Sequence, residues 1–249
     1  MLDGKIILIT GAAQGIGQAY CIGLSKLGAM IVATDIVDVS ETIEKVGTDR
    51  ISGHIMDVTS AECTTEIVDL VVGRFGRIDG LVNNAALYGS LHGGRFDQIS
   101  DSDWDRTMIV NVKGIWNCCK AVIPRMFDQG AGSIVNISSL AAVYGMPYGL
   151  HYATSKAAVI GLTRSLAREV GRKNVRINSV APSAVVTDST RQFFGEKYDN
   201  ALEKIRSNQI IDRNLQPNDV IGTVAWLLSD ASAFVTGQTI MVDGGTVLL

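Results

Sequence analysis

A glycine-rich turn between an apolar strand and a helix constrains the fold of this chain more than any other feature. Residues 5–10 form an apolar run of strand length. Apolar side chains then recur at the spacing of one helix face, at Ile16, Tyr20, Leu24 and Leu27. Strand, glycine turn and helix in this order are the context that a dinucleotide-binding turn requires. An ordinary strand-to-helix turn is the alternative, since the G-x-x-x-G-x-G spacing matches the generic G-x-G-x-x-G pattern only in part.

Each glycine of this turn has its own task if the turn binds a dinucleotide. Gly11 allows the tight turn, Gly15 lets the backbone approach a pyrophosphate, and Gly17 lets the helix pack closely on the strand. The first turn of the helix offers free N–H groups and a positive dipole end to the phosphates. We therefore expect this turn, with Gln14 and Ile16 among its glycines, to bind the cofactor.

An acidic residue ends the second strand. Residues 30–34 are apolar and lead to Asp35, whose carboxylate can accept hydrogen bonds from both ribose hydroxyls of an adenosine and would repel a 2′-phosphate. No cation stands at the positions where a 2′-phosphate would need one, namely Ala12, Ala13, Gln14, Ile36 and Val37. The sequence therefore favours NAD over NADP as cofactor. A plain turn or cap role for Asp35 is the alternative.

A tyrosine and a lysine stand four residues apart on a predicted helix, after a pair of serines. Side chains at i and i+4 share one helix face, so the Lys156 ammonium can lie near the Tyr152 phenol and favour its ionised form. Such a phenol suits proton transfer, because an ordinary phenol with a pKa near 10 is a poor base at neutral pH. Most pairs of this kind are solvated surface neighbours, and the glycine turn upstream is what favours a catalytic role here.

Further motifs follow in a fixed order, and together they resemble those of the short-chain dehydrogenase/reductase family. The resemblance runs essentially end to end and includes Thr10-Gly-x-x-x-Gly-Ile-Gly17, Asp57-Val58, Asn83-Asn84-Ala85, Asn111-Val112, Ile137-Ser138-Ser139, Tyr152-x-x-x-Lys156, Asn178-x-Val-x-Pro182 and Asp243-Gly-Gly245. It implies a Rossmann-type domain and hydride transfer between NAD(H) and a secondary alcohol or ketone. Relatives usually carry Gly where this chain has Ala86 and Ser183, so we expect altered loop conformation there without loss of activity.

The resemblance also implies a catalytic set. Tyr152 is the general acid–base, with its pKa depressed by Lys156 and the oxidised nicotinamide, and Lys156 also hydrogen-bonds the nicotinamide ribose. Ser139 holds the substrate oxygen; Ser138 is adjacent and would point the other way on an extended strand, and both the spacing and the family pattern select Ser139. Asn111 holds a water that relays protons from Lys156 to solvent. A helix kink caused by the Asn111 amide is the alternative from propensity alone.

Cofactor contacts beyond the glycine turn and Asp35 follow from the same resemblance. We expect Asp57 and Val58 to meet the adenine, and Asn83 to pack near the adenine ribose while stabilising the sheet. A mainly structural role for residues 83–85 is the alternative. The remaining expected contacts are Ala85, Tyr152, Lys156 and Pro182, with Val185 and Thr187 at the carboxamide.

Strand-like and helix-like segments alternate along the whole chain. The strand candidates after residue 34 are 51–56, 78–83, 132–138, 175–181 and 238–242, with helical patterns such as 61–75, 152–170 and 219–228 between them. We expect one α/β domain over 1–249: a doubly wound, mostly parallel, seven-stranded sheet of Rossmann type with helices on both faces. The motifs fall at the carboxyl ends of the strands, where such sheets bind ligands.

One segment interrupts this rhythm and is the expected substrate lid. Residues 187–214 are long for a connection and carry several aromatic side chains, which suggests short helices of their own. The aromatics either line the substrate pocket or only anchor the lid. The expected substrate residues are Tyr88, Tyr144, Tyr148, His151 and Phe193, although His151 could equally be just a helix N-terminal residue. An apolar, aromatic rim favours a cyclic or aryl secondary alcohol or ketone.

The charge and hydropathy of the chain restrict the kinds of binding partner to be expected. The net charge is −3 with no Lys/Arg-rich block, which excludes nucleic acid as an expected partner. No apolar run approaches the roughly 18 residues of a membrane helix, so we attribute the mean hydropathy of +0.22 to a buried parallel sheet and subunit contacts. No secretion leader is visible, so we expect a cytoplasmic protein. We expect free thiols and no metal site, because the four cysteines lack disulfide or metal spacing: Cys21, Cys63, Cys118 and Cys119.

We also expect a homotetramer. Val159, Leu162 and Leu166 form an apolar stripe on the helix after Tyr152, and the chain closes on the apolar residues 247–249. Relatives of the resembled family commonly form tetramers. Packing of the stripe only on its own sheet is the alternative.

Two other functions compete with the alcohol dehydrogenase interpretation. A 3-oxoacyl-[acyl-carrier-protein] reductase of the same family would commonly present a basic side chain where this chain has Asp128-Gln129-Gly130, and would usually take NADP. A non-catalytic dinucleotide sensor would have no chemical need for Asn111, Ser139, Tyr152 and Lys156 together.

Overall fold

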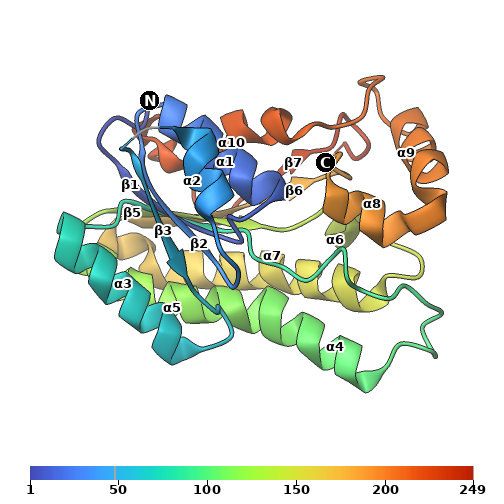
Figure 1. Cartoon of the computed structure of the whole chain (residues 1–249), viewed down its shortest axis with the longest axis horizontal. Coiled ribbons are helices and arrows are strands. Elements are labelled where there is room, and N and C mark those ends of the chain that lie inside the picture. Colours follow the sequence, from blue (N-terminus) through green and yellow to red (C-terminus); the bar gives the residue numbers. More distant parts are fainter. Residues whose placement is uncertain (48, 249) are drawn as a thin grey trace.

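Seven parallel strands form one sheet in the computed structural model, which describes residues 1–47 and 49–248. The strand order is β3-β2-β1-β4-β5-β6-β7, and every neighbouring pair is parallel (Figure 1). The strands are β1 Ile6–Thr10, β2 Met30–Asp35, β3 Ile51–Ile55, β4 Gly80–Asn83, β5 Gly132–Ile137, β6 Val175–Pro182 and β7 Thr239–Val242. The expected doubly wound sheet is confirmed, and it is parallel throughout.

Helices connect these strands and cover both faces of the sheet. The α-helices are α1 Gly15–Lys26, α2 Ser40–Val46, α3 Ala61–Phe75, α4 Asp101–Met108, α5 Gly114–Asp128, α6 Ala141–Tyr144, α7 Leu150–Val170, α8 Asp188–Phe194, α9 Tyr198–Ser207 and α10 Ile221–Leu228. Shorter turns are the π-helical η1 Ile109–Lys113 and the 3-10 segments η2 Gly171–Lys173, η3 Gly195–Lys197, η4 Pro217–Val220 and η5 Asp230–Ser232.

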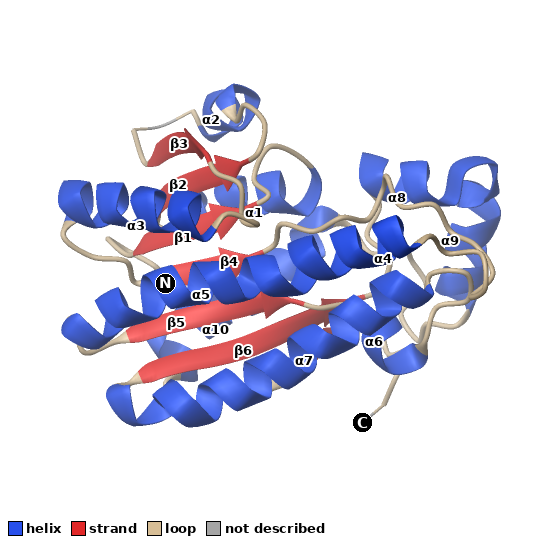
Figure 2. Ribbon diagram, turned by 90° about the horizontal axis from the view of Figure 1, so that it is seen from below, coloured by secondary structure: helices blue, strands red, loops and turns tan. Residues whose placement is uncertain are grey.

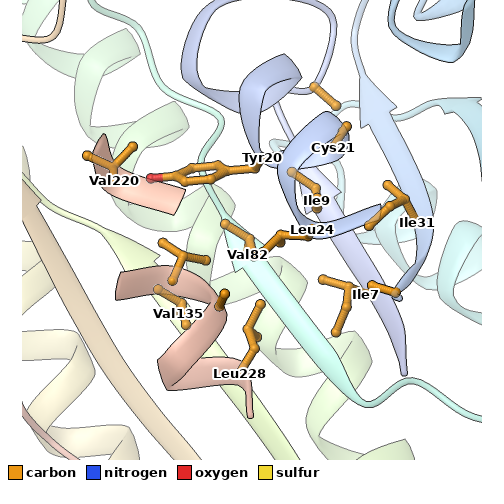
Figure 3. Close-up of a cluster of buried hydrophobic side chains, with 14 of the residues drawn as sticks. Ile7, Ile9, Tyr20, Cys21, Leu24, Ile31, Val82, Val135, Val220 and Leu228 are labelled. Carbon is orange, nitrogen blue, oxygen red and sulfur yellow. The ribbon is translucent and has the colours of Figure 1, made fainter. Parts of the chain in front are cut away.

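The alternation of side chains along β1 explains the two-sided core. Ile7 and Ile9 face α1 and α10 and pack with Tyr20 and other apolar side chains (Figure 3). Ile6 and Leu8 point to the opposite face, which α3, α5 and α7 cover (Figure 2). Burial on both faces accounts for the apolar strands. No helix within the described residues is long and apolar enough to cross a membrane.

The path of the chain places a ligand-binding crevice at the ends of β1 and β4. The chain runs outward from β1 to β3 on one side of the sheet and then returns to build β4 to β7 on the other side. Parallel sheets bind ligands beyond the carboxyl ends of the strands at such a reversal. In this chain α8 and α9, which follow β6, lie beyond that end of the sheet (Figures 1 and 2).

Several predicted element boundaries need correction. The helix that carries Tyr152 begins at Leu150, and the last helix begins at Ile221, because residues 217–220 form a 3-10 turn. Residues 187–214 do contain the expected short helices, α8 and α9. Asn111 lies in the π-helical segment η1 and not in regular α-helix.

Candidate active site

A cavity of about 1260 Å³ opens at the carboxyl ends of the strands. It is lined by residues that follow or end different strands, so chain segments far apart in sequence meet there. Of the expected residues, its walls contain Gly11, Gln14, Gly15, Ile16, Gly17, Asp35, Asp57, Val58, Ala85, Tyr88, Ser139, Tyr144, Tyr152, Lys156, Pro182, Val185 and Thr187. The fold therefore assembles most of the expected residues around one space.

The glycine turn leaves room on the cavity side and none on the protein side. A Cβ atom at Gly11 would lie 2.7 Å from the Cα of Ala85, and one at Gly17 would overlap the backbone oxygen of Gly11. At Gly15, which has a φ of 58°, the nearest atom to such a Cβ would be Cγ2 of Thr187 at 3.9 Å. Because α1 begins at Gly15 and its N-cap residue makes no side-chain capping bond, free N–H groups face this space. The turn fits a pyrophosphate.

The carboxylate of Asp35 lies on the cavity wall at the end of β2. Its oxygens accept hydrogen bonds from the backbone N–H groups of Ala13 at 2.9 Å and of Val37 at 3.4 Å. Carboxylate oxygens have further lone pairs, so Asp35 can still accept from ribose hydroxyls. Among the described residues no ion pair joins Asp35 to a cation. This end of the cavity fits an unphosphorylated ribose.

Ser139 and Tyr152 meet at the centre of the cavity. The Ser139 side chain lies near enough to the Tyr152 phenol to offset part of the rise in its pKa, and the Ser139 oxygen accepts from the N–H of Ala141 at 3.2 Å. Ser138 turns the other way and donates to the backbone oxygen of Lys156 at 2.8 Å. The alternation of an extended strand thus brings Ser139, and not Ser138, to the phenol.

Lys156 is buried beside Tyr152 but does not hydrogen-bond to it. Its Nζ atom donates to the backbone oxygen of Ile137 at 2.8 Å and lies 5.8 Å from the centre of the Tyr152 ring. Burial lowers the pKa of Lys156 to about 8 and raises the pKa of Tyr152 to about 12. The depressed phenol pKa expected from Lys156 together with an oxidised nicotinamide stays a prediction for the protein with bound cofactor. Without cofactor, desolvation is the largest influence on the phenol and raises its pKa.

Asn111 lies behind the cavity wall and hydrogen-bonds to the loop after β4 and to α7. Its amide donates to the backbone oxygen of Leu87 at 3.2 Å and to Oγ of Ser155 at 3.0 Å, and its oxygen accepts from the N–H of Leu87 at 2.7 Å. Ser155 in turn donates to the backbone oxygen of Tyr152. The water relay expected of Asn111 stays a prediction. The π-helical turn around Asn111 agrees with the alternative, a local distortion of the helix.

Asn83 also lies outside the cavity wall. Its amide is buried, donates to Oδ1 of Asn136 at 2.8 Å and approaches the sulfur of Cys119 at 3.6 Å. The neighbouring Asn84 reaches the wall instead and donates to the backbone oxygens of Thr10 and Gly11 at 3.0 and 2.9 Å. Asn83 therefore links β4 to β5, in agreement with the sheet-stabilising role expected of it, and its place near the adenine ribose stays a prediction.

Three of the expected substrate residues are not on the wall either. Tyr148 has a φ of 64° and is 68% exposed. His151 is fully buried, with no hydrogen-bond partner for either ring nitrogen. Phe193 stacks on Tyr88 with ring centres 4.7 Å apart, and Phe194 lines the cavity in its place. Successive residues of a helix point about 100° apart, which is why sequence alone did not separate these two rings.

The cavity also contains residues that the sequence analysis did not select. Polar and charged side chains on its wall include Arg106, Gln192, Lys204 and Asn208, which stand outside the family motifs and so gave no motif signal. Asn84 stands inside the Asn83-Asn84-Ala85 motif, but its contact with the cavity was not predicted. Ala86 and Ser183, the two departures from the family pattern, are not among the described non-glycine residues with positive φ, so neither is strained in place of a glycine.

Two further expectations concern metal ligands and cysteine thiols anywhere in the chain. Within the described residues no group of His, Cys, Asp or Glu side chains could hold a metal ion. The four cysteines are free thiols, and burial raises the pKa of Cys119 to about 12.

Fold and site together define a dinucleotide-binding oxidoreductase of the doubly wound α/β class. The chain belongs to the short-chain dehydrogenase/reductase family: residues 11–247 match a family model described as enoyl-(acyl carrier protein) reductase. Like other members, it is an oxidoreductase that uses a nicotinamide dinucleotide.

Its relatives act on different substrates. The chain is 38% identical to the 3-oxoacyl-[acyl-carrier-protein] reductase FabG of Thermotoga maritima, over 99% of each chain. It is 35% identical to the D-threitol dehydrogenase of Mycolicibacterium smegmatis, over 98% of this chain and 93% of the relative. The crystal structure of levodione reductase superposes with a TM-score of 0.91 at 29% identity and covers 98% of both chains.

Proposed function

We propose that this protein transfers hydride between NAD(H) and a secondary alcohol or ketone, with Tyr152 as general acid–base. The observation that carries the proposal is that Tyr152 and Ser139 lie on the wall of one cavity together with the glycine turn and Asp35. A substrate oxygen beside these two hydroxyls would be within reach of a proton donor and of a second hydrogen bond.

The protein's own groups would hold the cofactor and the reacting oxygen. The backbone of residues 11–17 would hold the pyrophosphate and Asp35 the adenosine ribose, with Lys156 at the second ribose. The nicotinamide, when bound, supplies or accepts the hydride. Ser139 would donate a hydrogen bond to the substrate oxygen, while Tyr152 gives it a proton during ketone reduction or takes one during alcohol oxidation.

Tyr152 is protonated at neutral pH in the protein without cofactor, which is the state that ketone reduction needs. Its raised pKa of about 12 makes it a weaker acid than an exposed phenol. Alcohol oxidation needs a lower phenol pKa, and the positive charge of an oxidised nicotinamide beside Lys156 would act in that direction.

The substrate end of the cavity is mainly apolar. Leu87, Tyr88, Tyr144, Met146 and Phe194 lie on its wall. Apolar and aromatic walls favour a cyclic or aryl substrate over a highly charged one. The helices α8 and α9 would act as its lid, since residues 189–208 contribute to the same wall.

A 3-oxoacyl-[acyl-carrier-protein] reductase is the second candidate, favoured by the similarity to the Thermotoga maritima enzyme. Two features of this chain oppose it. Asp35 would repel the 2′-phosphate of NADP. The other is Gln129, which stands where a basic residue would meet the acidic carrier. Its side-chain nitrogen donates to the backbone oxygens of Ile78 and Ala131, and its side-chain oxygen accepts from the N–H of Ile78.

We further propose that the protein is a homotetramer with no nucleic acid or membrane partner. Of the stripe, Val159 is buried in the chain's own core, whereas Leu162 and Leu166 pack against this core and stay partly exposed. Exposed apolar side chains such as Trp116 and Leu248 also support the proposal. Leu249, the last residue of the expected contact, lies outside the described residues.

One substrate panel tests these alternatives. Cyclic, aryl and linear secondary alcohols and ketones are assayed with NAD(H) and NADP(H), beside an acetoacetyl thioester of acyl carrier protein. We expect turnover of cyclic or aryl substrates with NAD(H). Preference for the thioester with NADPH would establish the second candidate, and tight NADH binding without any turnover would indicate a dinucleotide sensor.

A further inference from the structure

Tyr88 lies between the proposed acid–base residue and the first lid helix. Its ring centre is 4.9 Å from that of Tyr152, at an interplanar angle of 37°. On its other side the ring stacks on Phe193 of α8, with centres 4.7 Å apart and planes 15° apart. Phe193 meets Phe194 edge to face at 5.2 Å. The stacked arrangement of Tyr88 with Phe193 and the edge-to-face arrangement of Phe193 with Phe194 are both favourable for aromatic pairs.

Thr190 of the same lid helix lies beside the Tyr88 hydroxyl, and its own hydroxyl donates to the backbone oxygen of Val185 at 2.7 Å. Thr190 is one turn before Phe193 on α8, so both residues face Tyr88 from one side of the helix. The stack on Phe193 is therefore the contact that holds the Tyr88 ring against α8.

The backbone next to Tyr88 packs closely on the same helix. A Cβ atom at Gly89 would lie 3.0 Å from both the Cα and the backbone oxygen of Ser189. Only a glycine allows an approach this close. The loop after β4 and the start of α8 are therefore in direct contact, and displacement of α8 would carry the stacked rings apart.

The other end of α8 faces the cofactor turn. Thr187 is the N-cap of α8, its hydroxyl accepts from the N–H of Thr190 at 3.2 Å, and its methyl group lies near the open side of Gly15. One short helix thus contacts the glycine turn at its start and, through Phe193 and Tyr88, the ring of Tyr152 at its end.

We propose that Tyr88 is a positioning residue that couples the lid helix α8 to the acid–base ring of Tyr152. With α8 in place, the stack of Phe193 on Tyr88 holds the Tyr152 ring and keeps water from it. When α8 moves away, Tyr88 loses its support and the Tyr152 ring loses its neighbour. Catalysis therefore requires the lid helix to be docked, although no residue of α8 takes part in proton transfer. The catalytic part of this inference rests on the role proposed for Tyr152.

The test compares variants that keep or remove the ring. Tyr88→Leu and Phe193→Leu each remove one partner of the stack, whereas Tyr88→Phe keeps it. Phe96→Leu is the control, because Phe96 is 75% exposed on the neighbouring loop. Backbone amide hydrogen exchange of residues 188–194 reports on docking of α8 without reference to activity. An aromatic pair changes such an equilibrium by about two- to ten-fold.

We expect faster exchange of residues 188–194 in both leucine variants and in their double mutant. The exchange rate of the double mutant should exceed that of either single variant by no more than about two-fold, because both substitutions break the same contact. The kcat of both should fall about ten-fold while the Kd for NADH stays within about two-fold, since the rings are not assigned to the cofactor. Phe96→Leu should behave like the wild type, and Tyr88→Phe, which keeps the stack, should show exchange of residues 188–194 closer to the wild type than Tyr88→Leu does.

Unchanged exchange in folded Tyr88→Leu or Phe193→Leu would overturn the coupling. If Tyr88→Leu does not fold, Phe193→Leu decides alone. If amide exchange of residues 188–194 is faster in both leucine variants but their kcat is unchanged, the positioning role of Tyr88 is overturned. The Tyr152→Phe variant separates this inference from the proposed function: it retains the ring and should keep wild-type exchange, so its activity alone tests the role of Tyr152.

Discussion

The ammonium of Lys156 lies 5.8 Å from the centre of the Tyr152 ring and hydrogen-bonds to the backbone of Ile137 instead of the phenol. The two groups are therefore neighbours without sharing a proton. Burial keeps Tyr152 protonated and makes the Lys156 ammonium give up its proton more readily than an exposed one, with pKa values of about 12 and about 8. This arrangement leaves a buried, protonated phenol beside a lysine of lowered pKa before any cofactor binds.

Replacement of Tyr152 by Phe should abolish turnover and leave NADH binding largely intact. The ring remains, but the transferable proton is lost, and removal of a general acid–base group costs about 100- to 10,000-fold in rate. Tyr148→Phe is the matched control, since Tyr148 is exposed and outside the cavity wall. Steady-state kinetics and NADH fluorescence titration make the measurement. A Tyr152→Phe enzyme with more than about a tenth of wild-type kcat contradicts the assignment.

Replacement of Asp35 by Ala should shrink the preference for NAD. In the wild type we expect kcat/KM to favour NAD over NADP by about 100-fold, or about 2.7 kcal/mol. The carboxylate faces the cavity, while that of Asp38, which bonds to Ser40, is an exposed control. Both cofactors are compared with one substrate. Equal efficiency with NADP in the wild type would refute the prediction.

Lys156→Met should alter the pH dependence of stability. The folded pKa of about 8 lies below the ordinary value of 10.5, so between these values the unfolded chain binds more protons than the folded one, and the free energy of unfolding rises with pH. From pH 7.5 to 9.5 the wild type should gain about 2 kcal/mol relative to Lys156→Met. Urea unfolding without cofactor measures this, with the exposed Lys197→Met as control. Parallel curves for wild type and Lys156→Met would show that the lysine pKa is not depressed.

The glycine turn predicts different outcomes for two alanine variants. Gly17→Ala places a methyl group against the backbone of Gly11 and should destabilise the fold by about 1–3 kcal/mol. Gly15→Ala meets open space and strains only its own backbone, so its main effect should be weaker NADH binding. Thermal unfolding and NADH titration of both variants test the distinction. Equal losses of stability would contradict it.

Light scattering should give a particle mass near four times that of the 26.6 kDa chain. Deletion of residues 247–249 should weaken this assembly, because it removes an apolar end of which Leu248 is 80% exposed. A monomeric mass at micromolar concentration would exclude the tetramer, and an unaffected deletion variant would exclude the tail from the contact.

The strands, the glycine turn and the main site residues could be predicted from local sequence because each depends on short-range rules. Apolar runs predicted all seven strands, and the spacing of Gly11, Gly15 and Gly17 predicted the cofactor turn. The choice of Ser139 over Ser138 needed only strand alternation and the spacing to Tyr152. These expectations agree with the structure because strand and helix periodicities decide direction within one element.

The sequence by itself determined the element order, the parallel sheet and the edge at which its motifs meet. Only the tertiary structure decided which side chains reach the cavity: it placed Asn84 on the wall in place of Asn83 and Phe194 in place of Phe193, and it buried His151 away from the site. It also decided the direction of the pKa shift of Tyr152 without cofactor, since desolvation depends on everything that packs around a group. The stack of Phe193 on Tyr88 joins residues 105 positions apart. Local periodicity carries no information about such a contact, because the docking of one element on another creates it.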